Sequence, residues 1–212
     1  MKNPILNLLN QLLPKLNFPI TEDQTNALFQ FLNLLEKWNK VYNLTAIRNK
    51  EEMVIKHLLD SLSIAPYIHG DTILDVGTGA GLPGIPLAIL FPEKKFTLMD
   101  SNNKKIRFLV QAKQFLGLSN ITIIHSRAEI HQESSGFDSI ISRAFATIHD
   151  MIEYTKHLLA PEGQFLAMKG IYPEEEMQHI ILPYQIIACH TLVIPGLTAK
   201  RHLICIKMSQ NS

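Results

Sequence analysis

The segment Asp75-Val-Gly-Thr-Gly-Ala-Gly-Leu-Pro-Gly84 decides the fold of this chain. It follows a short apolar run, Thr72–Val76, and leads into an apolar stretch that predicts a helix at 82–91. A strand that ends in a glycine-rich turn and continues into a helix is typical of α/β domains that bind nucleotides. Glycines suit such a turn because the backbone can approach the ligand without a Cβ atom in the way.

The spacing of the glycines and the residue before them indicate the class of ligand. Gly77, Gly79 and Gly81 place the third glycine one residue earlier than in the G-x-G-x-x-G pattern of dinucleotide-binding proteins. The Asp75 carboxylate would repel the phosphates of NAD or FAD, which bind at a helix N-terminus, but it can help to hold a cation directly or through water. These features predict S-adenosylmethionine (AdoMet), which carries a sulfonium and an α-ammonium group, and they disfavour an NAD-dependent oxidoreductase.

Two further parts of the predicted nucleoside site follow the next two strands. Asp100 comes directly after the strand expected at 95–99, where doubly wound proteins place an acid that accepts hydrogen bonds from ribose hydroxyls. The alternative role for Asp100 is to cap the following helix. After the strand expected at 121–125, Ala128 and Glu129 are placed to face an adenine ring, although an ordinary turn would also explain this segment.

The pattern beyond the glycine loop predicts an α/β, Rossmann-like fold with a seven-stranded, mostly parallel sheet. Apolar runs predict strands at Thr72–Val76, 95–99, 121–125, 139–142, 164–168, 184–194 and 202–208, and helices at 82–91, 104–116 and 151–159. Strands that alternate with helices form parallel βαβ units with helices on both faces of the sheet. The last two strands are expected to close the sheet as a pair.

The N-terminal part of the chain predicts a helical cap. Apolar residues recur at helical spacing over 5–16, and a third helix is expected at 51–62. Between them, Thr21 and Gln24 have the spacing of a capping box, which marks the start of a long helix. We therefore expect a helical cap at 1–65 and an AdoMet-binding domain at 66–212.

The composition limits the other classes of function. The net charge of +1 gives no basic field over the whole protein, so that a nucleic-acid site has to be a local patch. Cys189 and Cys205 lie in apolar surroundings and are expected to be buried thiols rather than zinc ligands or a disulfide framework, which indicates a cytoplasmic protein. The sequence predicts no signal peptide, no membrane helix and no metal site, and it favours a monomer.

Several motifs occur in order along the chain and together resemble one family. They are Trp38-Asn-Lys-Val-Tyr-Asn-Leu-Thr45, His57-Leu-Leu-Asp-Ser61, the glycine segment from Asp75 to Ala88, Ser142-Arg-Ala-Phe-Ala146, Lys169-Gly170 and Arg201-His-Leu203. Over about residues 25 to 207 the chain resembles the bacterial 16S ribosomal RNA guanine-N7 methyltransferase G family, also called glucose-inhibited division protein B. Ala80 departs from the family pattern, in which proline is common, but alanine is compatible with a compact loop.

The resemblance implies a class I AdoMet-dependent methyltransferase that modifies N7 of a single guanine, guanine 527 in the 530 loop of 16S rRNA. The implied partner is 16S rRNA or the small ribosomal subunit. AdoMet binding is implied for Gly77, Leu82, Ala128, Glu129 and Arg143. Roles in RNA binding or catalysis are implied for Arg127, Arg143, Lys169 and Arg201.

The positions of the last three cations agree with a site at the mouth of the predicted crevice. Arg143 and Lys169 each follow a predicted strand, and Arg201 opens the last strand. A guanidinium at the position of Arg143 can bind a phosphate, a carboxylate or the O6 atom of guanine. For each of the three residues the alternative is a surface ion pair or a solvated charge.

Polar residues of the cap are candidates for the same crevice. Asn39, Lys40 and Asn43 near the end of the second helix are expected to line the crevice and bind RNA. His57 and Asp60 are three residues apart in the third helix. They form either a proton relay or a structural pair.

Methylation of guanine N7 does not need the catalytic motifs that are absent from this sequence. N7 has a lone pair and no proton, so that methyl transfer to it requires positioning and no general base. The sequence contains neither the Asn-Pro-Pro-aromatic motif of enzymes that methylate exocyclic amines nor a cysteine in a polar turn for attack on a pyrimidine. Two other functions stay open: a small-molecule methyltransferase in which the cap is a lid, and a non-catalytic ribosome-assembly factor that keeps the AdoMet-binding fold.

Overall fold

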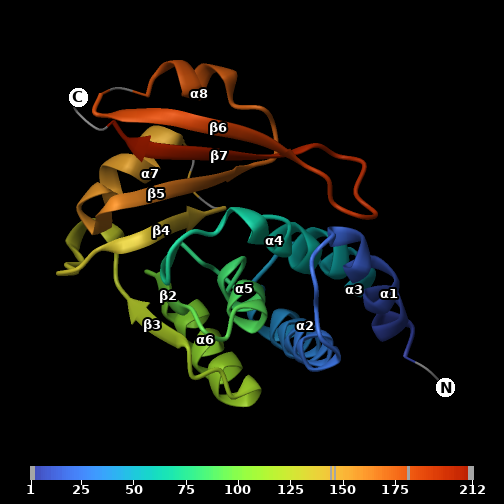
Figure 1. The fold of residues 1–212 in the computed structure, drawn as a ribbon. Coiled ribbons are helices and arrows are strands. Elements are labelled where there is room, and N and C mark those ends of the chain that lie inside the picture. Colours follow the sequence, from blue (N-terminus) through green and yellow to red (C-terminus); the bar gives the residue numbers. More distant parts are fainter. Residues whose placement is uncertain (1–2, 144, 146, 181, 210–212) are drawn as a thin grey trace.

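The computed structural model describes residues 3–143, 145, 147–180 and 182–209, and Figure 1 shows their arrangement. The helical elements are α1 (Pro4–Leu12), η1 (Leu13–Leu16), α2 (Glu22–Tyr42), α3 (Lys50–Met53), η2 (Val54–Leu59), α4 (Asp60–Leu62), η3 (Ala65–Tyr67), α5 (Gly84–Leu90), α6 (Asn103–Leu116), η4 (Ala128–Ile130), α7 (Ile148–Thr155), η5 (Lys156–Leu158) and α8 (Glu174–Gln178). The strands are β1 (Thr72–Val76), β2 (Lys95–Asp100), β3 (Ile121–His125), β4 (Phe137–Ser142), β5 (Leu159–Lys169), β6 (Tyr184–Leu192) and β7 (Arg201–Met208).

The strands form one sheet in the order β3-β2-β1-β4-β5-β7-β6. β7 pairs antiparallel with β5 and β6, and the other neighbouring strands pair parallel. The seven-stranded, mostly parallel sheet predicted from the sequence is therefore confirmed. The carboxyl ends of β1 to β6 meet at one edge of the sheet, and the reversed strand β7 begins at that edge.

Alternate residues along the strands face two hydrophobic cores, one on each side of the sheet. On one side, Ile73 and Leu166 pack in a core that also contains Leu9 of α1 and Leu28 of α2. On the other side, Phe165 packs with residues of α7. Helices cover both faces (Figure 1), as the alternation of strands and helices predicts, and the first core runs without a break from the sheet into the cap.

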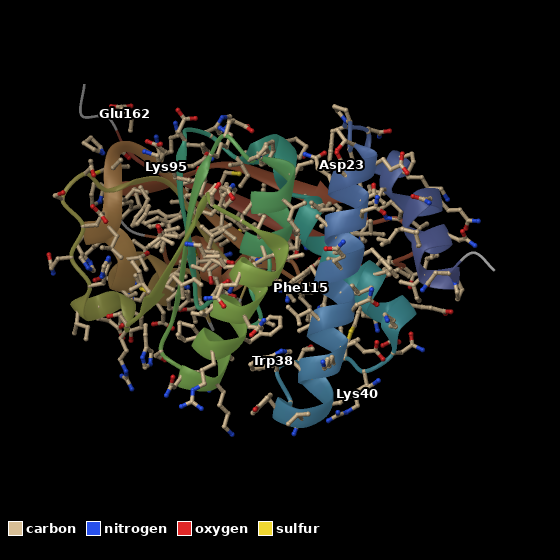
Figure 2. All side chains as sticks on the ribbon, turned by 90° about the horizontal axis from the view of Figure 1, so that it is seen from below. Asp23, Trp38, Lys40, Lys95, Phe115 and Glu162 are labelled. Atoms are coloured by element: carbon tan, nitrogen blue, oxygen red, sulfur yellow. The ribbon has the colours of Figure 1, made fainter. Side chains whose placement is uncertain are left out.

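Within the cap, α2 begins with the predicted capping box and packs against α5 and α6. Oγ1 of Thr21 accepts a hydrogen bond from the backbone of Gln24, and Oε1 of Gln24 accepts one from the backbone of Thr21. The Trp38 ring packs edge-on against Phe108 of α6, with 5.6 Å between the ring centroids, and Figure 2 shows it between α2 and α6. None of the helices within the described residues is long and apolar enough to cross a membrane.

The helix expected at 51–62 contains a π-helical turn. Helical residues run from α3 through α4, but the six residues of η2 form a π-helix. Such wide turns are frequent at functional sites. This one contains the buried His57 and directly precedes the buried Asp60.

Three expectations about local structure are corrected. Cys189 is exposed, whereas Cys205 is buried, because β6 is an edge strand whose residues alternate between the sheet and solvent. The helix expected at 151–159 is instead α7, which Thr147 caps and which ends at Thr155. β5 begins earlier than expected because Leu159 already pairs with Phe137 of β4.

Candidate functional site

Two neighbouring cavities open at the carboxyl edge of the sheet, one on each side of the end of β4. The β1–β3 cavity, of about 320 Å³, lies at the ends of β1, β2 and β3. The β4–β7 cavity, of about 410 Å³, lies between the cap and the strand ends of the other half of the sheet. Arg143 lines the second cavity and Phe145 the first, so that the segment after β4 borders both. Ligands of doubly wound folds bind at this edge.

The β1–β3 cavity brings together four residues that the sequence predicts to bind the cofactor, namely Gly77, Asp100, Ala128 and Glu129. Arg127, which the resemblance implies in RNA binding or catalysis, lines the same cavity. Sequence reasoning missed the rest of the wall, which consists of Val76, Met99, Ser101, Lys105, Ser126 and Phe145. The wall therefore combines apolar side chains for a ring with one carboxylate at the end of β2.

Asp75 lies beneath this cavity and does not line it. Its side chain is fully buried, and its Oδ2 atom accepts hydrogen bonds from Oγ1 of Thr78 (2.6 Å) and from the backbone N–H of Gly84 (2.7 Å). Burial raises the pKa of Asp75 to about 7, although both hydrogen bonds and the charge of Arg143 lower it. The structure gives Asp75 no exposed surface for direct contact with a cation, which is one of the two modes, directly or through water, that the sequence left open. Its two hydrogen bonds hold the glycine loop.

Glycine is required at the different positions of this loop for different structural reasons. Gly77 lines the β1–β3 cavity and has φ 66°, a conformation that favours glycine. Gly79 donates its backbone N–H to Oδ2 of Asp100 at 2.9 Å. A Cβ atom at Gly81 would lie 2.4 Å from Ile85, and one at Gly84 would lie 2.2 Å from Leu98. Gly81 and Gly84 therefore serve packing, and Leu82, which is buried, also lies outside the set of residues that line the cavity.

The carboxylate of Asp100 is oriented by the loop and by its own helix. Besides the bond from Gly79, its Oδ1 atom accepts the backbone N–H of Asn102 at 2.8 Å, and Nζ of Lys105 lies 3.5 Å from Oδ2. The residue that caps α6 is Asn102, whose side chain accepts from the backbone of Lys104. Asp100 is therefore not the helix cap that we considered as an alternative.

The β4–β7 cavity contains all three residues that the sequence predicts to be catalytic. Arg143 comes from the end of β4, Lys169 from the end of β5 and Arg201 from the start of β7. The cap supplies the facing wall through Thr45, Ala46, Ile47, Lys56, His57 and Asp60. Met168, Gly170, Leu192 and His202 complete the lining. The cavity thus depends on contacts between the cap and the sheet.

Asp60 pairs with both arginines of this cavity. Nη1 of Arg143 donates to its Oδ2 atom at 3.1 Å, and Nε of Arg201 lies 3.2 Å from its Oδ1 atom. Arg143 also donates to the carbonyl oxygen of Lys56 at 3.3 Å. The Asp60 side chain is 5% exposed, so that these ion pairs are weakly screened by solvent. One carboxylate therefore fixes two cations from different strands.

Lys169 is held by α8. Its Nζ atom lies 2.8 Å from Oε2 of Glu176, and the same carboxylate oxygen accepts the backbone N–H of Ile148 at 2.7 Å. Glu176 therefore links the end of β5 to the start of α7. This contact could not be predicted, because α8 contains three consecutive glutamates that are equivalent by pattern.

His57 is part of the wall and is neutral near pH 7. Burial, and then the charge of Arg143, lower the pKa of His57 to about 4. Its Nδ1 atom lies 3.2 Å from the carbonyl oxygen of Lys56 and therefore carries the proton, so that Nε2 accepts from Oγ1 of Thr45 at 2.9 Å. His57 and Asp60 thus bind different partners, and they form neither the relay nor the pair that we considered.

The three cap residues predicted to bind RNA differ in exposure. Asn39 is 2% exposed, and its amide donates to the carbonyl of Ile47 and accepts from the backbone of Thr45. It therefore shapes the loop that walls the β4–β7 cavity instead of lining the crevice. Lys40 and Asn43 are exposed, with Lys40 paired to Glu36 on its own helix.

The contacts of Asp60 were missed because its partners, Arg143 and Arg201, are distant in sequence. Asp60 and Arg143 are 83 positions apart, and neither residue carries a local signal of the other. The family motif that contains Asp60 indicated that this segment is important, but it did not indicate which residues Asp60 contacts. Within the described residues, no three histidine, cysteine or acidic side chains cluster in a way that would hold a metal ion.

Comparison with solved structures defines the class of fold. The chain resembles ribosomal protein L11 methylase from Lactobacillus delbrueckii subsp. bulgaricus with a TM-score of 0.55 and 19% identity, over 72% of this chain and 77% of that chain. It resembles precorrin-6y C5,15-methyltransferase from Geobacter metallireducens with a TM-score of 0.51 and 12% identity, over 69% and 86% of the two chains. The fold is therefore the Rossmann-like fold found in methyltransferases.

Sequence relatives define the family. The sequence model of the family rRNA small subunit methyltransferase G (GidB) matches residues 24–204. The chain is 47% identical to ribosomal RNA small subunit methyltransferase G of Aeromonas salmonicida, over 97% of this chain and 99% of the relative. It is 50% identical to the Pseudomonas aeruginosa protein of the same name, over 91% of each chain. The chain belongs to this family, which confirms the resemblance drawn from its motifs.

Substitution of Asp75 by asparagine should remove a specific pH dependence of stability. Between about pH 4 and pH 7 the folded protein keeps the Asp75 proton that the unfolded chain, with a pKa of 3.8, has released. The contribution of Asp75 to the unfolding free energy therefore falls as the pH rises through this window, by up to roughly 4 kcal/mol. Urea unfolding of the wild type and Asp75→Asn at several pH values measures the difference. Parallel pH profiles for the two proteins would contradict the assignment.

Substitution of Gly77 by valine should abolish the binding of AdoMet, because the added methyl groups would project from the wall of the β1–β3 cavity. Isothermal titration calorimetry measures the affinity. Gly117→Val is a matched control: Gly117 also has φ 66°, but no atom lies within 4 Å of its added Cβ atom. Unchanged affinity in Gly77→Val, or equal losses in both variants, would refute the role of Gly77.

Proposed function

We propose that this protein transfers a methyl group from AdoMet to N7 of a single guanine of 16S rRNA, guanine 527 in the 530 loop. The relatives that match nearly its whole length are named as small-subunit rRNA methyltransferases. The main structural support for this proposal is the pair of cavities that lie on either side of the end of β4. One is suited to a nucleoside and the other is lined by cations.

The β1–β3 cavity fits the nucleoside part of AdoMet. A carboxylate has about four lone-pair sites, and Asp100 uses two of them for well-placed backbone donors, which leaves capacity for ribose hydroxyls. The small, buried side chain of Ala128 and the half-buried Phe145 leave room for a flat ring beside them. Glu129, which is exposed at this wall, is proposed to face the adenine.

The residues of the β4–β7 cavity suit an acceptor that needs orientation and no deprotonation. When bound, AdoMet supplies an electrophilic methyl group on a sulfonium sulfur. Guanine N7 has a free lone pair, so that the chain has only to align the base, and alignment alone supplies several kcal/mol in such reactions. Two histidines, His57 and His202, line this wall, and both ring nitrogens of His57 are engaged in hydrogen bonds. His57 is therefore assigned a structural role.

The cations of the cavity are proposed to hold the base and its phosphates. Arg143 lines the β4–β7 cavity two residues before Phe145, which lines the other cavity, and it is proposed to contact either the cofactor or O6 of the guanine. Arg201 and Lys169 lie at the same mouth and are proposed to bind the RNA backbone around the target. Exposed Arg127, Lys40 and Asn43 extend this surface. The protein is proposed to act as a monomer in the cytoplasm, where the small subunit is assembled.

Mass mapping of small-subunit rRNA tests this function. RNA from cells that lack the protein should have lost one methyl group on a guanine of the 530 loop, and re-expression of the protein should restore it. A guanine that stays methylated in the deleted cells would contradict the proposal. Purified subunits that bind the protein but accept no labelled methyl group would favour an assembly factor, and labelling confined to metabolites would favour a small-molecule enzyme.

Substitution of Arg143 by alanine should lower kcat/KM for small subunits by about 10- to 100-fold, the effect of losing a hydrogen bond to or from a charged group. The fold should survive, because the Arg143 side chain is 27% exposed. Transfer of tritiated methyl groups measures turnover, and circular dichroism measures the fold. Arg107→Ala, which removes an exposed guanidinium on α6, serves as the control. Full activity in Arg143→Ala would show that its pairing with Asp60 is only structural.

A further inference from the structure

We infer that Asp60 is a positioning residue that balances the charge of the β4–β7 cavity, so that a guanine can become cationic there. The inference rests on the proposed function. It assigns to Asp60 an effect on the rate of methyl transfer, exerted through Arg143 and Arg201, and not a contact with the substrate.

The geometry makes Asp60 the common partner of the two arginines. Its Oδ2 atom lies 3.1 Å from Nη1 of Arg143, and its Oδ1 atom lies 3.2 Å from Nε of Arg201. The Asp60 side chain is 5% exposed, whereas each arginine side chain is 27% exposed and lines the cavity. A guanidinium carries five N–H donors, so that one pairing leaves others to reach into the cavity. Asp60 thus fixes both guanidiniums from behind.

The proposed reaction places a new positive charge close to these guanidiniums. The N7 lone pair forms the bond to the methyl carbon, and the electron pair of the broken carbon–sulfur bond stays on sulfur. No proton moves, and the guanine ring gains one unit of positive charge. Two uncompensated arginines would oppose this change, because like charges repel at short range. The carboxylate of Asp60 offsets one of them.

Two other residues of the cavity, Lys169 and His57, also add little net positive charge to it. Lys169 is paired with Glu176 at 2.8 Å. His57 stays neutral because burial and Arg143 hold its pKa low. The cavity therefore binds an anionic RNA through cations whose charges are largely offset by acids behind them, which leaves the base itself in a nearly neutral environment.

This charge balance predicts that replacement of Asp60 lowers the rate of methyl transfer without weakening the binding of the RNA. Asp60→Asn adds one net positive charge to the cavity, which favours binding of the RNA polyanion. The same charge disfavours the cationic product-like transition state. The single-turnover rate should therefore fall while KM for the RNA stays equal or decreases. A residue that only supports the fold would raise KM and weaken AdoMet binding when it is replaced.

The test uses the full chain and small ribosomal subunits from cells that lack the protein. We expect Asp60→Asn to lower the single-turnover rate constant by at least about tenfold, with unchanged AdoMet affinity and KM no higher than in the wild type. Glu153→Gln, which removes a carboxylate on α7 that is paired with Lys156, is the control and should behave as the wild type. A rate within twofold of the wild type, or a KM that rises with the loss of rate, would overturn the inference.

Asp60→Glu separates charge from geometry and also decides the matter if the asparagine variant does not fold. It keeps the carboxylate, so that its rate should stay within about tenfold of the wild type and above that of Asp60→Asn. A larger loss would overturn the charge argument. If the wild type transfers no methyl group to the subunits, the proposed function fails, and the inference fails with it. If the wild type transfers the methyl group and Asp60→Asn does so at the same single-turnover rate, only the inference is rejected and the proposed function stands.

Discussion

The buried carboxylate of Asp75 is the constraint on which the site depends. Asp75 lies one residue before the end of β1, and through Thr78 and the backbone of Gly84 it fixes the loop that leads into α5. The clamp requires close approach of helix and sheet, since any side chain at Gly84 would overlap Leu98 and Asp75 itself. With the loop held, Gly77 forms the cavity wall and Gly79 orients Asp100. A buried group without exposed surface thus determines the shape of a site that it does not touch.

The end of β4 divides the carboxyl edge of the sheet into two chemical environments. On the side of β1 to β3 the wall combines apolar side chains with the carboxylates of Asp100 and Glu129. On the side of β5 to β7 the wall is cationic, but acids from the cap and from α8 stand behind the cations. The cap is therefore an integral part of the second environment, because it supplies Asp60 and the loop that Asn39 shapes.

Features with a local cause could be predicted from the sequence. The glycine loop, the capping box of Thr21 and Gln24 and the parallel βαβ units depend on neighbouring residues, and the structure confirms them. The roles of Asp60, Asn39 and Glu176 could not be predicted, because each depends on a partner that the fold brings from another element. Asp75 was identified as important for its charge, whereas its burial, which only the packed helix α5 creates, gives it a structural role.

The central claim is that one crevice holds the cofactor nucleoside and directs its sulfur toward the cation-lined cavity. A crystal structure of this protein with S-adenosylhomocysteine tests the claim most directly. We expect the ribose at Asp100, the adenine beside Ala128 and the sulfur at the end of β4 near Arg143. A nucleoside bound elsewhere, or one whose sulfur points away from the β4–β7 cavity, would contradict the account.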